Sequence, residues 1–135
     1  MPNATVRERY LGYIACLNAQ AWDRLDRYIG AGVTYNGAPL GFTAYRQARQ
    51  DEFRDIPDLH FAVQLLAVDG NTVASRLHFR ITPTGDFLGL PVNGRCIAFA
   101  EHAFYTFDNG KIASVRSILD KAAIEAQLAP PAAKR

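Results

Sequence analysis

The stretch CIAFAEHAFYTFDNGKIASVRSIL, residues 96–119, decides the fold. It holds two runs rich in β-branched and aromatic residues, and the residues DNGK separate them. Asn-Gly between two such runs is a strong signal for a tight turn, so the sequence predicts a β-hairpin. If Asn109 and Gly110 are the two turn residues, Asp108 pairs with Lys111.

This register predicts which side chains share a face of the hairpin. Arg116 would lie opposite Ala103. Glu101, Arg116 and Asp120 would share one face, and the aromatic residues on that face would be Phe99, Tyr105 and Phe107. Charged side chains among apolar ones either face solvent or line a polar cavity. A bulge of one residue would turn Glu101 to the other face, so the position of Glu101 depends on the turn.

A second hairpin is expected earlier in the chain. HFAVQLLAV (60–68) and VASRLHFRI (73–81) flank DGNT, another turn signal. Arg76, His78 and Arg80 alternate with apolar residues, so one face of the second strand is basic. This basic face fits a polar sheet surface or a contact between two copies of the chain. It also fits an anion site, or a general acid/base at His78.

Helical segments come before these strands. Thr5 begins a capping-box pattern, and apolar residues follow it at helical spacing. The expected elements are helices over 5–19 and 21–29, a strand over 32–37, and a helix that Thr43 caps and Pro57 ends. Helices followed by strands indicate an α+β domain. We expect a curved, mostly antiparallel sheet with the N-terminal helices packed on one face and a pocket between the layers.

Composition narrows the class of protein. The 135 residues are 49% apolar and 21% charged, which fits one globular domain over 1–128 with a flexible tail over 129–135. A net charge of +2 is too weak to indicate a nucleic-acid partner. We expect no membrane span and a cytoplasmic location. Cys16 and Cys96 fit neither a metal cluster nor a disulfide framework, so no metal site is expected.

The middle and C-terminal segments resemble a known family. The matching features are an Arg-containing strand, a Thr-Gly-acidic-Phe-Leu-Gly segment, Pro-x-x-Gly-Arg, Gly-Lys-Ile, an aspartate and a final Gln-Leu. Here these are Arg76, Thr84 to Gly89, Pro91, Gly94-Arg95, Gly110 to Ile112, Asp120 and Gln127-Leu128. Over about 5–128 the chain resembles the SnoaL-like polyketide cyclase or ester cyclase family, which has the nuclear-transport-factor-like cone fold.

The resemblance implies a site. In these cyclases an aspartate in the last strand is the general acid/base of an intramolecular aldol ring closure, and no metal or organic cofactor takes part. Asp120 would inherit this role. Many relatives have Trp in place of Arg116 and commonly His in place of Pro83. Arg116 could hold Asp120 ionised in a structural ion pair, or it could bind an anionic group of the substrate. Asp120 also precedes the last helix and could cap it.

The expected function is cofactor-free acid/base catalysis, an aldol cyclisation or isomerisation of a small hydrophobic carbonyl compound. Asp120 would be the base, and Arg116 or His78 would stabilise charge. The expected substrate-binding residues are Tyr13, Tyr35, Asn36, Arg76, Phe99, Glu101 and Tyr105. Tyr13 is mostly core, although its hydroxyl could serve as a donor to an enolate.

Two alternatives stay open. One is an epoxide hydrolase or ketosteroid isomerase type of enzyme on the same fold, with Glu101, Arg116 and Asp120 as a loose version of the hydrolase set of two acids and an arginine. The other is a non-catalytic module that binds a small ligand or dimerises. A homodimer through the outer face of the sheet is expected in either case.

Overall fold

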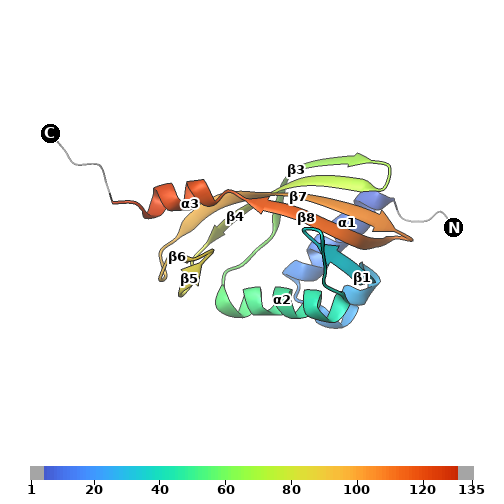
Figure 1. Cartoon of the computed structure of the whole chain (residues 1–135), viewed down its shortest axis with the longest axis horizontal. Coiled ribbons are helices and arrows are strands. Elements are labelled where there is room, and N and C mark those ends of the chain that lie inside the picture. The colour runs from blue at the N-terminus through green and yellow to red at the C-terminus, as the bar shows by residue number, and fades with distance from the viewer. Residues whose placement is uncertain (1–4, 131–135) are drawn as a thin grey trace.

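The computed structural model describes residues 5–130 and shows an α+β fold (Figure 1). A six-stranded sheet has the strand order β2-β1-β8-β7-β4-β3, and β5 and β6 form a separate two-stranded sheet. The helices are α1 (Val6–Asn18), the 3₁₀ helix η1 (Trp22–Arg27), α2 (Phe42–Asp55) and α3 (Lys121–Leu128). The strands are β1 (Ile29–Tyr35), β2 (Ala38–Pro39), β3 (Ala62–Asp69), β4 (Thr72–Ile81), β5 (Asp86–Phe87), β6 (Leu90–Pro91), β7 (Ile97–Asp108) and β8 (Lys111–Leu119).

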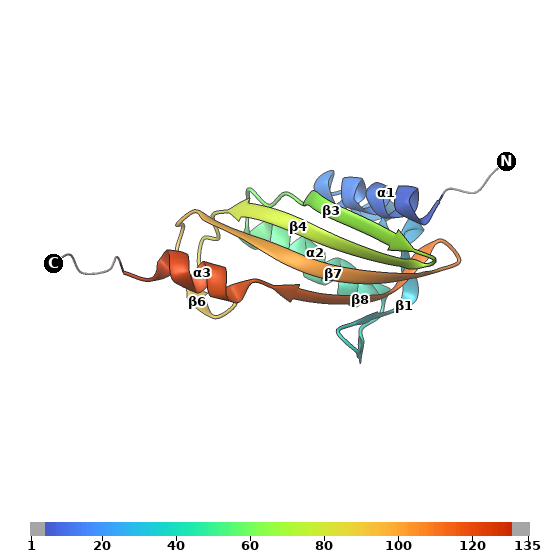
Figure 2. The same ribbon diagram turned by 90° about the horizontal axis from the view of Figure 1, so that it is seen from above.

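The helices α1 and α2 cover one face of the curved sheet, which we call the inner face (Figure 1). Figure 2, in which the molecule is seen from above, shows β3, β4, β7 and β8 in front of α2. All neighbouring strands of the large sheet are antiparallel except β1 and β8, which are parallel. This architecture confirms the expected α+β cone with its helices on one face.

The first helix begins where the capping pattern predicts. The Thr5 hydroxyl accepts a hydrogen bond from the backbone N–H of Glu8 over 3.1 Å, which satisfies one of the free donors of the first turn. Tyr10, Tyr13 and Leu17 then face the core at helical spacing and are buried. No helix in the described range 5–130 is long and apolar enough to span a membrane.

The start of α2 differs from the prediction. Gly41, not Thr43, is the N-cap, and its φ of 83° lies in the left-handed region that glycine adopts readily. The segment predicted as a helix over 21–29 forms the shorter 3₁₀ helix η1, and β1 begins at Ile29. The end of α2 follows from Pro57, because the residue before a proline avoids helical geometry.

The register of β7 and β8 corrects the central expectation of the sequence. Asp108 pairs with Lys111 as predicted, but the register shifts by one residue between Phe107 and Thr106. Ala113 is the extra residue of this bulge, and beyond it Arg116 lies opposite Phe104 instead of Ala103. Glu101, Arg116 and Asp120 therefore do not share one face.

Burial explains the bulge. Ile112 and Val115 are three positions apart, an odd spacing, so a regular strand would point one of them to solvent. The bulge turns both toward the core, where their exposed fractions are 0% and 2%. Without it, Arg116 would have to enter the core in place of Val115, which is far more costly.

The β5–β6 hairpin contains a strained turn. Its two turn residues, Leu88 and Gly89, have φ values of 53° and 76°. Such a turn favours Asn-Gly, and this chain uses Asn-Gly at three other positive-φ pairs, 36–37, 93–94 and 109–110. A leucine in this conformation costs about 1–2 kcal/mol.

We expect the substitution Leu88→Asn to raise the free energy of unfolding by about 1 kcal/mol, because asparagine adopts the left-handed conformation with less strain. Urea denaturation measures the change. Leu88→Ala is the control and should bring no gain, since alanine keeps the Cβ atom that causes the strain. A loss of stability in L88N would show that the Leu88 side chain contributes packing that outweighs the strain.

Candidate functional site

A small cavity lies between α2 and the inner face of the sheet. Its volume is about 50 Å³. Most of its wall is apolar, and the polar part comes from α2, β1 and β7. The lining residues are Tyr35, Arg49, Glu52, Ile56, Leu59, Phe61, Phe79, Ile81, Phe87, Phe99, Glu101 and Leu119.

The apolar wall is built of packed phenylalanines. The rings of Phe79 and Phe99 stack with their centroids 5.4 Å apart. The rings of Phe61 and Phe79 pack edge to face with their centroids 5.2 Å apart, and those of Phe87 and Phe99 are tilted with their centroids 5.5 Å apart. These rings come from β4, β5, β7 and the segment before β3, so four parts of the chain meet at this wall.

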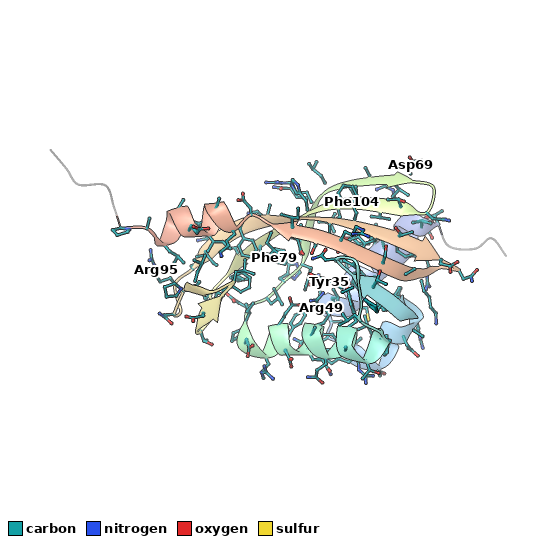
Figure 3. All side chains as sticks on the ribbon, in the orientation of Figure 1. Tyr35, Arg49, Asp69, Phe79, Arg95 and Phe104 are labelled. Atoms are coloured by element: carbon teal, nitrogen blue, oxygen red, sulfur yellow. The ribbon has the colours of Figure 1, made fainter. Side chains whose placement is uncertain are left out.

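The polar wall brings one cation and two carboxylates together. Arg49 and Glu52 are one turn apart on α2, and the Arg49 Nε and Glu52 Oε1 atoms are 2.6 Å apart. Glu101 approaches from β7 and is half-buried. Figure 3 shows Arg49 and Tyr35 in the layer between α2 and the sheet, on the side where Phe79 also lies.

Tyrosines fix the position of the arginine. The Arg49 guanidinium lies 4.9 Å from the ring centroid of Tyr45 and 5.6 Å from that of Tyr35. The hydroxyls of Tyr45 and Tyr13 are 2.5 Å apart, and both side chains are buried. The Tyr35 hydroxyl is 3.0 Å from Ser117 Oγ on β8. Arg49 is thus held between two aromatic rings and a carboxylate.

Burial sets the protonation behaviour of the site. It raises the pKa of Glu101, and the negative charge of Glu52 raises that pKa further. The Ser117 hydroxyl and the positive charge of Arg49 lower the pKa of Glu101 but do not cancel the rise. Burial also raises the pKa of Glu52, and Arg49 opposes that rise. Burial alone would lower the pKa of Arg49, but the neighbouring oxygens of Tyr45 and Glu52 raise it well above its ordinary value. The site therefore combines a permanent cation with carboxyl groups whose proton affinity is increased.

This combination suits proton transfer. A carboxylate whose pKa is shifted toward neutrality accepts a proton from carbon better than an ordinary one and also returns it. A fixed cation in a partly desolvated cavity stabilises negative charge that develops on a neighbouring oxygen.

The structure places three of the predicted binding residues, Tyr35, Phe99 and Glu101, in the cavity wall. Tyr13 and Tyr105 are buried behind it, with ring centroids 5.9 Å apart. Asn36 is exposed at a turn, where its Oδ1 accepts a hydrogen bond from the Ser117 N–H over 2.8 Å.

Four other predicted residues lie away from this cavity. Asp120 is exposed and caps α3, because its Oδ1 accepts a hydrogen bond from the Ala123 N–H over 3.1 Å. Arg116 is exposed on the outer face, and no ion pair joins it to Asp120 within residues 5–130. His78 and Arg76 also lie on the outer face of β4, as the alternation predicts.

Arg76 already has partners on the outer face. Its Nε donates to Gln64 Oε1 over 2.6 Å. Its Nη1 is 2.6 Å from Nε2 of His102 on the neighbouring strand. The two interactions connect the Arg76 side chain to β3 and β7, the strands on either side of β4.

Sequence reasoning missed Arg49, Glu52, Tyr45 and Ser117 as site residues. A signal for the first three was present, since Tyr45, Arg49, Glu52 and Ile56 follow at spacings of four, three and four on α2. An arginine and a glutamate in the inward stripe of an amphipathic helix indicate a polar cavity. Ser117 becomes inward-facing only through the bulge at Ala113.

Comparison with known proteins identifies the family. The family model described as SnoaL-like polyketide cyclase matches residues 7–128. The chain belongs to the SnoaL-like polyketide cyclase family. A solved SnoaL-like polyketide cyclase from Agrobacterium tumefaciens is 45% identical to this chain, with a TM-score of 0.92, and the match covers 94% of this chain and 100% of that one.

More distant structures show the same fold. TsrD from Streptomyces laurentii is 21% identical with a TM-score of 0.80, and the match covers 95% of this chain and 97% of that one. Wild-type IdmH from Streptomyces antibioticus is also 21% identical with a TM-score of 0.80, and coverage is 93% and 99%. A comparison with curated proteins found no match.

The pKa shift of Glu101 predicts a pH dependence of stability. The folded chain disfavours the ionised form, so the contribution of Glu101 is most favourable below its ordinary pKa of 4.5 and is lost as the pH rises toward the raised value. We expect Glu101→Gln, which cannot ionise, to gain stability relative to the wild type over this rise. Urea denaturation of both proteins between pH 4 and 7 measures the difference. Parallel stability curves would contradict the raised pKa.

Proposed function

We propose that this SnoaL-like protein is a cofactor-free acid/base enzyme that cyclises or isomerises a small hydrophobic carbonyl compound, with Glu101 as the proton carrier. The observation that carries the proposal is that Glu101, whose pKa burial raises, and the fixed Arg49 cation line the same phenylalanine-walled cavity. The apolar and polar walls of the cavity match the character of an apolar ring and a carbonyl oxygen.

The chemistry follows from these two groups. The Glu101 carboxylate takes a proton from the carbon next to the carbonyl, and the electron pair moves onto the carbonyl oxygen as an enolate. Arg49 stabilises that oxygen. In an aldol closure the enolate carbon attacks a second carbonyl, a carbon–carbon bond forms, and the new alkoxide takes the proton back from Glu101. In an isomerisation the proton returns to a different carbon.

Glu52 is less suited to this role because it is paired with Arg49 over 2.6 Å. The role that the family resemblance gives to Asp120 is the competing assignment. The Asp120 carboxylate is exposed and caps α3, and it does not line the cavity that Glu101 and Arg49 share. We therefore place Glu101 first and test both.

Water addition to an epoxide is the second candidate function. Glu52, Glu101 and Arg49 line the same cavity, which supplies the two acids and one arginine that the hydrolase alternative requires. The volume of about 50 Å³ is enough for a water molecule. One carboxylate would take a proton from the water as its oxygen attacks the epoxide carbon, and a protonated carboxyl group would give a proton to the opening epoxide oxygen.

The decisive comparison is Glu101→Gln against Asp120→Asn. We expect E101Q to lower the rate of hydrogen–deuterium exchange next to the carbonyl of 2-tetralone by about 100-fold or more. D120N should keep most of the rate and its melting temperature, since asparagine also caps helices. Proton NMR in D₂O follows the exchange, and styrene oxide offered in parallel tests for hydrolysis. Loss of exchange in D120N with activity kept in E101Q would give the role to Asp120.

We also propose that the protein forms a homodimer through the outer face. Leu65, Phe104 and Ile118 lie on three strands of this face and are 65%, 55% and 78% exposed. Hollows of about 390 and 550 Å³ adjoin Phe104 on the same face. Protruding apolar side chains beside hollows on one surface supply the self-complementarity that a two-fold interface needs.

The double substitution Phe104→Asp and Ile118→Asp should convert the dimer to a monomer, because it places four carboxylates in the interface. Size-exclusion chromatography with light scattering measures the mass. The control Arg7→Asp changes the charge on an exposed position of α1 and should leave the dimer intact. A monomeric wild type would contradict the proposal.

A further inference from the structure

The inner cavity is much smaller than a ligand site. Its volume of about 50 Å³ compares with about 300–1,000 Å³ for typical small-molecule pockets. A second hollow of about 370 Å³ lies next to it, between the C-terminal half of α2 and the segment that leads into β5. We call this hollow the mouth. A ligand larger than a few atoms needs both spaces.

Three residues line both the cavity and the mouth: Glu52, Ile56 and Phe87. Glu52 and Ile56 are anchored on or beside α2, whereas Phe87 belongs to the β5–β6 hairpin. The Phe87 ring is half-buried and leans on Phe99 at a tilt of 42°. The Phe87 side chain therefore lies between the cavity and the mouth, and it comes from the β5–β6 hairpin and not from α2 or the large sheet.

The hairpin is built as a unit of its own. Its two strands pair with each other and not with the six-stranded sheet. The segments on either side of the hairpin, which we call its neck, are joined by two backbone hydrogen bonds. They run from Gly94 N to Pro83 O over 2.7 Å and from Asn93 N to Gly85 O over 3.0 Å. Below the neck, Thr82 is tied to the Asp58 carboxylate by two hydrogen bonds of 3.0 and 2.9 Å. A movement of β5 and β6 would therefore break no strand pairing of the large sheet.

We propose that Phe87 is a movable partition that closes the cavity, and that an apolar ring of the ligand replaces the Phe87 ring against Phe99. Moving Phe87 joins the cavity to the mouth, so this side chain sets the size of ligand that reaches Glu101. The inference rests on the proposed function only in taking the cavity as the active site. The mouth is lined by Asp51, Glu52, Asp55 and Asp86, with no basic residue among its lining residues, which favours neutral ring compounds over anions.

The rate of ligand entry tests this proposal. The probe is N-phenyl-1-naphthylamine, a neutral fluorophore, and stopped-flow fluorescence gives its association and dissociation rates. We expect Phe87→Ala to raise the association rate at least fivefold, because the closed state no longer limits entry. Phe87→Trp should lower it. Leu119→Ala enlarges the cavity away from the mouth, so it should leave the association rate unchanged.

A second control comes from the same hairpin. Leu88 lines neither space, so L88A should associate like the wild type. The proposal is overturned if F87A associates within twofold of the wild type, if F87A fails to bind the probe, or if L119A accelerates entry as much as F87A.

Glu101→Gln separates this proposal from the proposed function. E101Q should bind the probe with wild-type rates while it loses exchange activity. If E101Q keeps exchange activity, the function assigned to Glu101 fails, and the F87A and L119A rates still decide the role of Phe87.

Discussion

The single extra residue at Ala113 determines the chemistry of both faces of the sheet. Beyond this bulge, Val115, Ser117 and Leu119 point inward and Arg116 points outward. Glu101 on the neighbouring strand therefore meets Ser117 and not Arg116. A regular strand would have put an arginine into the aromatic core and removed the hydroxyl that contacts Glu101. The burial of both Ile112 and Val115 thus determines that Arg116 lies on the outer face and does not reach the cavity that Glu101 and Arg49 line.

The inner site is stable because its charges are compensated on several sides. An isolated guanidinium in a phenylalanine-walled cavity would carry a large desolvation cost. Arg49 offsets this cost through Glu52 at 2.6 Å and through the rings of Tyr45 and Tyr35. Tyr45 is in turn held by Tyr13 from α1. Three elements therefore fix one cation, and Glu101 forms no ion pair within the described residues 5–130.

Much of the fold could be read from the sequence, and less of the site. Turn and capping residues act locally, so the turn residues predict the two hairpins and the Thr5 capping box predicts the start of the first helix. The bulge depends on a competition between two registers that differ in the burial of Ile112 and Val115, and a pattern of alternation does not resolve that competition. The spacing of Arg49 and Glu52 from Tyr45 places them in the inward stripe of α2, but the packing of α2 on the sheet determines that they share a cavity with Glu101.

The smallness of the cavity and its chemistry are linked. Glu101 and Arg49 influence each other strongly only while water is excluded, since electrostatic interactions weaken as the local dielectric rises. If Phe87 simply moved aside, water from the mouth would enter and bring the pKa of Glu101 back toward its ordinary value. A ligand ring that takes the place of Phe87 against Phe99 keeps the apolar wall complete. The same ligand that opens the site would then preserve the dry environment that increases the proton affinity of Glu101, so that catalysis would be coupled to a ligand of the right size.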